Sequence, residues 1–311
     1  MAEQAEKQTK RAEAQETPEV TAVTCLARAF YASPDDLAAR IPELRPLRDK
    51  KIALVGLGCL GAPSALEFAR AGLGQLGLVD HDVVDPAASV RWPFGFRAAG
   101  QKKVHVIKDV VEHDYPYTRV KAFDLRVGGI RDANRRPGQE LLARLMDGAD
   151  LVYDCTAEVG VQHFLTDYAW ECGITYIGVA GTRGGWGGKV FRIRPTADSA
   201  CFFCYRLACE QDEGISEPPA APAATGQIQP TGCADHTFTG AGFDMLQVAL
   251  MGVRMAVSTL CEEADHAYPA VTWDAVHIGF RNQAGELIPP TYETYRIKPQ
   301  PSCWRCGGKS V

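Results

Sequence analysis

Residues 51–61 read Lys-Ile-Ala-Leu-Val-Gly-Leu-Gly-Cys-Leu-Gly, and this stretch decides the fold. Its first five residues form an apolar run of the length of a buried strand. Gly56, Gly58 and Gly61 then follow the spacing G-x-G-x-x-G. Glycines allow a tight turn and a close approach of the backbone to a ligand, and the start of a helix offers free N–H groups to a phosphate. The stretch predicts a nucleotide-binding loop, although a glycine turn without a ligand has the same pattern.

Strand-like and helix-like segments alternate along the rest of the chain. The predicted strands are residues 51–55, 76–80, 119–125, 151–154, 175–180, 189–194, 271–280 and 291–298. The predicted helices are residues 62–71, 102–112, 141–146, 159–172 and 243–261. The last helix is apolar on most faces, so we expect it to be buried. This alternation predicts an α/β, Rossmann-like fold: a mostly parallel sheet with helices on both faces and a late antiparallel section.

Changes in composition divide the chain further. Residues 1–48 are an N-terminal extension that we expect to be partly disordered, followed by short helices. Residues 49–311 are expected to form the nucleotide-binding domain. Within this domain, residues 209–236 are rich in proline, alanine and glycine, and we expect them to form an exposed crossover loop.

The overall composition excludes several classes of protein. The 311 residues are 46% hydrophobic and 23% charged, which is typical of a globular protein. A formal net charge of −5 argues against a protein whose main task is to bind nucleic acid. No continuous apolar run reaches the roughly 18 residues that a membrane span needs. We therefore expect a cytoplasmic protein with neither a nucleic acid nor a membrane as a partner.

Two Cys-x-x-Cys pairs, Cys201/Cys204 and Cys303/Cys306, lie far apart in the sequence. Four thiolates suit tetrahedral zinc, and two ligands three residues apart can share one ion. The chain shows no signal-peptide pattern, so we expect its thiols to stay reduced and not to form disulfides. The sequence thus predicts a structural zinc site that joins the C-terminal region to the middle of the chain. Two unrelated redox or core cysteine pairs are the alternative.

Charged residues follow the glycine loop at informative positions. Asp80 ends the next strand, at the spacing expected for an acid that binds ribose hydroxyls. Arg91 and Lys103 follow, and a dinucleotide dehydrogenase has no need of such cations here. An enzyme that splits ATP between its α and β phosphates needs them, because cations stabilise the charge that builds up on pyrophosphate. The alternative, that both are solvated surface charges, stays open.

Taken in order, these motifs resemble those of the ThiF-type adenylyltransferases. This family covers ubiquitin-activating enzymes and the bacterial enzymes that activate small sulfur-carrier proteins for thiamine and molybdopterin synthesis. The resemblance runs from about Lys51 to Gly308. The residues that carry it are Gly56-x-Gly58-x-x-Gly61, Asp80-x-Asp82, Arg91, Gly100-Gln101-Lys102-Lys103, Asp154-Cys155-Thr156 and the two cysteine pairs.

The resemblance implies a reaction in which a C-terminal carboxylate attacks the α-phosphate of Mg-ATP and forms an acyl adenylate and pyrophosphate. By the same resemblance, Asp80 holds the ribose, and Asp82 helps to position Mg²⁺ or the nucleotide. Arg91 and Lys103 are the implied catalytic cations. The implied nucleotide-binding set is Gly56, Gly58, Gly61, Asp80, Asp82, Arg91, Lys103 and Asp154. The implied cofactors are ATP, Mg²⁺ and Zn²⁺.

Relatives carry a reactive cysteine after the crossover loop, and Cys233 occupies that place here. The resemblance implies that Cys233 accepts the activated carboxylate as a thioester. A nucleophilic thiol must be accessible and of lowered pKa, and an exposed loop suits the first condition. An inert loop cysteine is the alternative, and Cys209 is a weaker candidate.

The chain departs from the family pattern at three places. Residues 87–89 read Ala-Ala-Ser where relatives have an asparagine before the arginine. Ala157 stands where relatives have an aspartate that supports Mg²⁺, and Glu158 is its neighbour. The N-terminal segment lacks the Arg-Tyr-x-Arg-Gln signature of an arginine lent to a partner subunit. A divergent active enzyme and a subunit with a partly lost site both fit these departures.

The leading hypothesis is an enzyme that activates a ubiquitin-like or sulfur-carrier protein. Its expected partner is a small β-grasp protein with an exposed C-terminal glycine. The resemblance also implies a homodimer, and a conjugating enzyme is a further candidate partner. The alternatives are a peptide-adenylating enzyme of natural-product synthesis, a non-catalytic partner subunit of an activating enzyme, and an NAD-dependent oxidoreductase.

Overall fold

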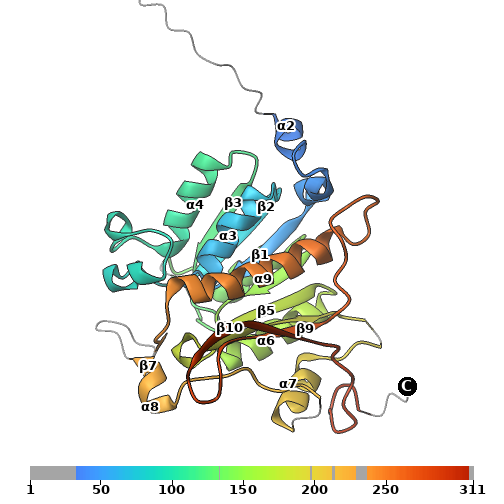
Figure 1. Cartoon of the computed structure of the whole chain (residues 1–311). Helices are drawn as coiled ribbons and strands as arrows, with labels where there is room; N and C mark the ends of the chain where they lie inside the picture. Colours follow the sequence, from blue (N-terminus) through green and yellow to red (C-terminus); the bar gives the residue numbers. More distant parts are fainter. Residues whose placement is uncertain (1–32, 133, 197, 212–213, 229–236, 308–311) are drawn as a thin grey trace, which may run out of the picture. The chain divides into compact units, whose positions relative to one another are not determined.

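The computed structural model describes residues 33–132, 134–196, 198–211, 214–228 and 237–307. By its contacts the chain divides into two units, Met1–Ser33 and Pro34–Val311. All helices and strands with defined bounds belong to the second unit, which Figure 1 shows as a twisted sheet covered by helices.

Within the described residues, eight strands form one large sheet at the centre of the second unit. They are β1 (Lys51–Val55), β2 (Gln75–Asp80), β3 (Arg119–Asp124), β4 (Leu151–Asp154), β5 (Thr175–Gly181), β6 (Gly187–Ile193), β9 (Ala275–Arg281) and β10 (Leu287–Tyr295). Their spatial order is β10-β9-β6-β5-β4-β1-β2-β3. Strands β1 to β5 pair in parallel, whereas β6, β9 and β10 are antiparallel. The predicted fold class is therefore confirmed.

Helices cover both faces of the sheet because β1 is apolar on both sides. Ile52 and Leu54 share a core with α3 (Gly61–Arg70), α4 (Lys103–Asp114) and α9 (Gly242–Cys261). Ala53 and Val55 point the other way, as alternate residues of a strand must, toward a second core. That second core is formed with α5 (Gly138–Met146), α6 (Val159–Glu171) and α7 (Phe202–Glu210).

Short elements complete the connections between the strands and the long helices. They are α2 (Pro34–Ala38), η1 (Pro42–Asp49), η2 (Pro86–Val90), η3 (Phe96–Ala98), η4 (Arg183–Gly185), α8 (Ala223–Gly226), β7 (Gln227–Ile228) and β8 (Thr237–Phe238). β7 and β8 pair with each other in a separate two-stranded sheet. This hairpin belongs to the segment between α7 and α9 that the sequence predicts as a crossover loop.

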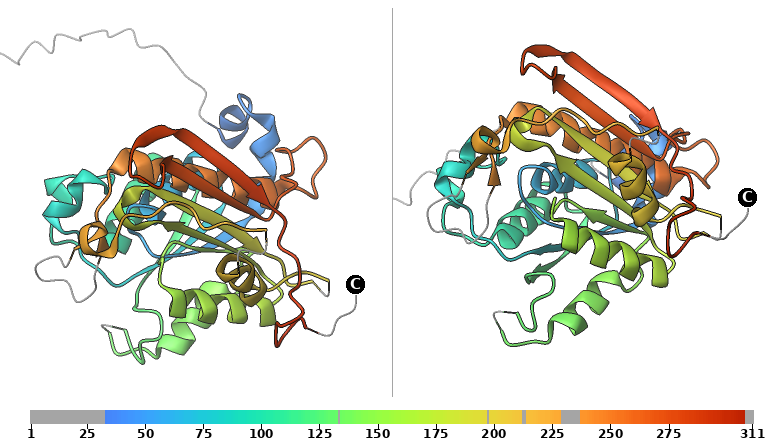
Figure 2. Two further views of the ribbon diagram at one scale, coloured as in Figure 1. Left: turned by 60° about the horizontal axis from the view of Figure 1, so that its bottom comes forward. Right: turned by 90° about the horizontal axis from the view of Figure 1, so that it is seen from below.

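The last strand differs from its prediction. The expected strand over residues 291–298 is β10, which starts earlier, at Leu287, and ends at Tyr295. The sequence prediction placed the start of this strand too late because Pro289 and Pro290 lie there, and proline cannot donate a hydrogen bond to a sheet. β10 tolerates them because it is an edge strand, and its register to β9 shifts between Leu287 and Thr291. Figure 2 shows the β9–β10 hairpin standing out from the rest of the sheet.

Helix α9 is buried on one face and exposed on the other, whereas its apolar composition predicted a buried helix. Phe243, Leu246 and Leu250 are exposed, while Met245, Val248 and Ala249 are buried against the sheet. By length and composition alone α9 could span a membrane, because a window of 18 of its residues has a mean hydropathy of 1.3. Half of that window is buried in the fold, as in the core helix of a globular protein.

The contact between α9 and the sheet depends on a glycine. A Cβ on Gly252 would lie 2.7 Å from Cγ2 of Val179 and closer still to the hydroxyl of Tyr153. That hydroxyl also lies 3.1 Å from Oγ of Ser64 in α3 and donates to the carbonyl oxygen of Ala249 at 3.4 Å. Gly252 therefore lets α9 pack directly over β4 and β5.

We expect Gly252→Ala to lower the free energy of unfolding by up to about 2 kcal/mol, because an overpacking cost of about 1–3 kcal/mol outweighs the roughly 1 kcal/mol gain in helix propensity. Urea denaturation followed by circular dichroism measures the change. Arg254→Ala, on the exposed side of the same helix, should stay within about 0.5 kcal/mol of the unmodified protein. An unchanged or raised stability for Gly252→Ala would contradict this packing.

Candidate functional site

The glycine loop joins β1 to α3, and each of its glycines meets a different requirement. Gly56 has φ +86°, which favours glycine. A Cβ on Gly61, in the first turn of α3, would overlap the carbonyl oxygen of Gly56. A Cβ on Gly58 would meet nothing within 4 Å, so this position borders open space. The loop therefore has the close internal packing and the free side that a phosphate-binding loop needs.

Asp80, at the end of β2, fastens this loop. Its carboxylate oxygens accept the N–H of Leu57 at 2.6 Å and the N–H of Asp82 at 2.7 Å, and the residue is only 9% exposed. On the other side, Nε1 of Trp92 donates to the carbonyl oxygen of Leu57 at 2.8 Å. Each carboxylate oxygen has a second lone pair, so the proposed contact with a ribose is compatible with the fastening role. The sequence offered no signal for Trp92.

Asp82 and Lys103 form an ion pair beside the loop, with 2.8 Å between Oδ2 and Nζ. Burial raises the pKa of Asp82, but the hydrogen bond and the charge of Lys103 outweigh it and hold the pKa below its usual range. His81 lies 3.5 Å from the same carboxylate. Ligand atoms of Asp80, His81 and Asp82 lie within 4.8 Å of one another, and the two carboxylates offer the oxygen ligands that Mg²⁺ takes.

Arg91 and Lys103 both lie near the glycine loop. Burial raises the pKa of the Cys59 thiol within the loop, and the charges of Arg91 and Lys103 act against that rise. The guanidinium of Arg91 is turned toward β8, where it donates to Oγ1 of Thr237 at 2.8 Å and to the carbonyl oxygen of Phe238. The structure thus brings both predicted cations to the loop but gives each a protein partner.

Asp154, at the end of β4, is fully buried. Its Oδ1 accepts the N–H of Thr156 at 2.8 Å and the hydroxyl of Thr156 at 2.7 Å, while Oδ2 accepts the hydroxyl of Tyr176 at 2.7 Å. Burial raises the pKa of this carboxyl. Asp154 is therefore placed to shape the turn after β4, and its oxygens point into the protein. The partner Tyr176 carried no sequence signal.

Ala157 and Glu158 follow Thr156, at the place where relatives carry the aspartate that supports Mg²⁺. Ala157 has φ +55°, a left-handed conformation that aspartate and asparagine adopt more readily than alanine. The carboxylate of Glu158 caps α6 by accepting the N–H groups of Gly160 and Val161, at 3.3 Å and 2.7 Å. Glu158 is committed to this cap.

The sequence offers two candidate nucleophiles, Cys233 and Cys209. Cys233 lies outside the described residues, so its role stays a prediction. Cys209 is 7% exposed on α7, and burial raises the pKa of its thiol to about 11. A nucleophilic thiol needs the opposite, so Cys209 is poorly suited to that task.

The four predicted zinc ligands come together, although one pair follows β6 and the other follows β10 in the chain. All four sulfurs lie within 4.8 Å of one another and are buried. Sγ of Cys201 lies 3.9 Å from that of Cys204 and 3.5 Å from that of Cys303, near the ~3.8 Å between sulfurs around tetrahedral zinc. Backbone N–H groups of Gln300 and Cys306 donate to two of the sulfurs. The cluster could therefore hold a structural zinc ion.

The first cysteine pair, Cys201 and Cys204, lies at the start of α7, a helix that the sequence did not predict. Cys201 is the N-cap residue of α7 and Cys204 lies in its first turn, where the sequence suggested only a loop. Hydrogen bonds from neighbouring thiols, first from Cys204, lower the pKa of Cys201, and the same contact with Cys201 raises the pKa of Cys204. A metal ion bound by both sulfurs would have to displace the proton of Cys204.

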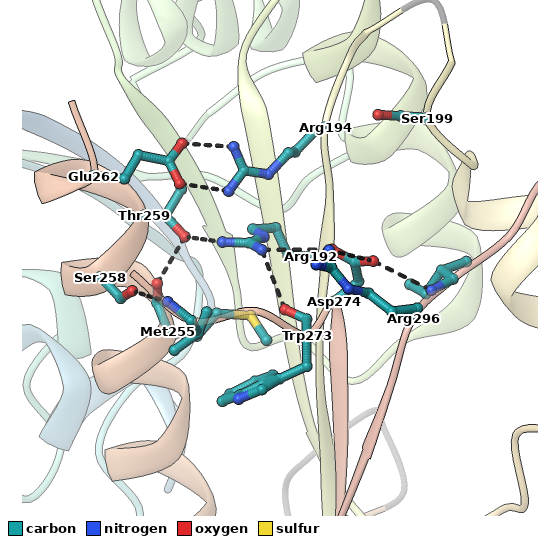
Figure 3. Close-up of polar contacts among 12 residues, drawn as sticks. Arg192, Arg194, Ser199, Met255, Ser258, Thr259, Glu262, Trp273, Asp274 and Arg296 are labelled. Atoms are coloured by element: carbon teal, nitrogen blue, oxygen red, sulfur yellow. Dashed lines mark hydrogen bonds and ion pairs between the residues drawn. The ribbon is translucent and has the colours of Figure 1, made fainter. Parts of the chain in front are cut away.

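Asp274, just before β9, ties together the two segments that lead to the cysteine pairs (Figure 3). Oδ1 lies 3.4 Å from Nη2 of Arg192 in β6, which leads to the first pair. Oδ2 lies 3.7 Å from Nη1 of Arg296 and accepts the N–H of Ile297 at 3.3 Å, after β10 and before the second pair. Arg192 also donates to Oγ1 of Thr259 in α9 at 2.9 Å. One carboxylate thus aligns both approaches to the cluster.

The fold, the fastened glycine loop and the cysteine cluster define a nucleotide-binding α/β protein with a candidate structural metal site. The chain belongs to the ThiF family, whose sequence pattern matches residues 37–282. The resemblance stated from the motifs is thereby confirmed.

Relatives and solved structures agree with this assignment. Protein y4qC of Sinorhizobium fredii is 36% identical over 273 residues, which cover 86% of this chain and 46% of that protein. The adenylyltransferase and sulfurtransferase UBA4 of Scheffersomyces stipitis is 24% identical over 215 residues, 69% of this chain and 41% of that protein. The E. coli MccB structure with ATP matches in fold, with a TM-score of 0.60 at 15% identity over 85% of this chain and 68% of that one. The chain spans about half the length of y4qC and about half the length of protein y4oA, a second relative of this chain.

We expect Asp274→Asn to speed the transfer of zinc to a chromogenic chelator, because weaker contacts with Arg192 and Ile297 loosen the two segments that lead to the cysteine pairs. The matched control is Glu112→Gln, which weakens an ion pair with Lys108 within α4 and touches neither segment. Equal transfer rates for the two variants would refute the alignment by Asp274. Metal analysis of the purified protein gives the starting zinc content.

Proposed function

We propose that this chain adenylates the C-terminal carboxylate of a small ubiquitin-like or sulfur-carrier protein at the expense of ATP. The observation that carries the proposal is the fastened glycine loop with two cations beside it, Arg91 and Lys103, in a chain of the ThiF family. A nucleotide that only carries a hydride does not need those cations, whereas cleavage between the α and β phosphates does.

In the proposed reaction, a carboxylate oxygen of the partner's last residue bonds to the α-phosphorus of ATP. The bond from the α-phosphorus to the bridging oxygen breaks, and pyrophosphate leaves with the electron pair. The N–H groups at the start of α3 face the phosphates, and Arg91 and Lys103 stabilise the leaving charge. Asp80 orients the ribose. Mg²⁺, held by Asp82, would neutralise phosphate oxygens.

The partner and the assembly are parts of the same proposal. A β-grasp protein with a C-terminal glycine would place its tail at the carboxyl ends of the strands, where nucleotides bind in open α/β sheets. The thiolate of Cys233 would attack the acyl carbon of the adenylate, and AMP would leave with the electron pair of the broken bond. A conjugating enzyme would then receive the acyl group from the thioester. We also propose a cytoplasmic homodimer, and the exposed apolar side chains Phe243, Leu246 and Leu250 of α9 offer it one surface.

A second candidate function has observations of its own. Ala157 provides no carboxylate, Glu158 is committed to capping α6, and Asp82 is paired with Lys103. A non-catalytic subunit that binds the nucleotide without consuming it would show these features. A peptide as the substrate is a further possibility, since solved relatives in fold include the microcin C7 biosynthetic enzyme MccB in complex with N-formylated MccA.

We expect the purified protein to bind Mg-ATP in preference to NAD, as measured by calorimetry. Asp80→Asn should weaken the binding of ATP by about tenfold or more, because a buried carboxylate that fastens the loop is lost. Circular dichroism of the variant controls for folding. Preference for NAD would reject adenylation in favour of an oxidoreductase. ATP–pyrophosphate exchange with a panel of glycine-tailed β-grasp proteins, and with short peptides, then separates the enzyme from the non-catalytic subunit.

We expect Ala157→Asp to tighten the binding of ATP when Mg²⁺ is present and not when EDTA is present. The reason is that aspartate restores a carboxylate at a backbone position whose left-handed conformation suits it. Ala157→Asn is the matched control, since it has the same shape and backbone preference but no charge. Equal gains for the two variants would show that relief of backbone strain, not metal binding, is responsible.

A further inference from the structure

Arg91 is held by a strand that lies far along the chain. It ends η2, and its guanidinium reaches β8, formed by Thr237 and Phe238. These residues lie 146 and 147 positions beyond Arg91, so no local motif links them to it. We propose that Thr237 and Phe238 are positioning residues that hold the guanidinium of Arg91 for the phosphates of ATP, an inference that rests on the proposed function.

Two hydrogen bonds orient the guanidinium without cancelling its charge. Nη2 donates to Oγ1 of Thr237 at 2.8 Å, and Nη1 donates to the carbonyl oxygen of Phe238. Both acceptors are neutral, and in the part of the chain that the structure describes no carboxylate pairs with Arg91. Lys103 differs, because its charge is paired with Asp82. Arginine has more N–H donors than these two bonds use, so an anion can still bind to it.

The ring of Phe238 provides a rigid platform for the cation. Cζ of Arg91 lies 5.2 Å from the centre of the ring, within the range of a cation–π interaction. The ring is wedged against the end of β5 and against α9. A Cβ on Gly181 would lie 3.2 Å from Cζ of Phe238 and 2.6 Å from Sδ of Met245, so the glycine leaves room for both side chains.

The backbone of Arg91 is fixed as well. Its neighbour Trp92 donates to the carbonyl oxygen of Leu57 in the glycine loop at 2.8 Å. A Cβ on Gly242, at the start of α9, would lie only 2.9 Å from Cα of Arg91. The side chain is therefore held at both ends. Because an arginine loses much conformational freedom when it is immobilised, holding it before ATP arrives lowers the entropic cost of binding.

The experiment compares the dissociation constants of Mg-ATP and AMP, because their ratio reports contacts with the β and γ phosphates and not with the adenosine. Thr237→Val removes the acceptor at constant shape, and Phe238→Leu removes the aromatic face. We expect each change, like Arg91→Ala, to reduce the preference for ATP by about tenfold while AMP binding changes little. Thr237→Ser and Phe238→Tyr should recover most of the preference.

The controls separate a failure of this inference from a failure of the proposed function. Arg206→Ala removes a positive charge from α7, on the other face of the sheet, and thermal unfolding shows that each variant is folded. Loss of preference in Arg91→Ala but not in Thr237→Val and Phe238→Leu overturns the positioning role and leaves adenylation standing. A normal preference in Arg91→Ala also overturns the inference. No preference for ATP over AMP in the unmodified protein overturns both.

Discussion

The carboxylate of Asp80 is the contact around which the nucleotide site is built. It lies at the end of β2 and binds the N–H of Leu57 in the glycine loop and the N–H of Asp82 in the turn that follows. Burying an N–H group without an acceptor costs free energy, so an irregular loop at the end of a strand needs such a partner. From this anchor follow the entry into α3, the place of Asp82 beside Lys103 and the contact of Trp92 with the loop.

Regular patterns made the sheet predictable from the sequence. The apolar runs at β1 and β4 and the glycine spacing predicted both the parallel section and the loop. The edge strand β10 was partly hidden, because Pro289 and Pro290 break the usual strand pattern and are tolerated only where one side of the strand is unpaired. Helix α7 was missed because the cysteine pair at its start, with Cys201 as the N-cap residue and Cys204 in the first turn, suggested a loop.

The candidate site was predictable in residue type but not in geometry. The resemblance to the family indicated Asp154 as a residue of the site, yet only the fold shows that its carboxylate is saturated by Thr156 and Tyr176. Spacing also indicated Arg91, yet its partners lie 146 and 147 positions away. Contacts of this kind depend on how the chain returns to the sheet after the crossover segment, and no local pattern encodes that. The cysteine cluster was the easier case, since four thiolates in two pairs have few other uses.

The cysteine cluster also has a consequence for how the protein is made. Cys201 and Cys303, whose sulfurs are neighbours in the cluster, lie 102 positions apart in the sequence, and β9 and β10 are made between the two pairs. During synthesis, Cys201 and Cys204 therefore leave the ribosome before Cys303 and Cys306. The four-sulfur site can form only after the second pair has also left it. Until β9 has been made, β6 has no neighbour on that side, and its free edge is open to pairing with other chains. β9 protects that edge before the second cysteine pair is made, and a metal would then tie the segment after β10 to the start of α7.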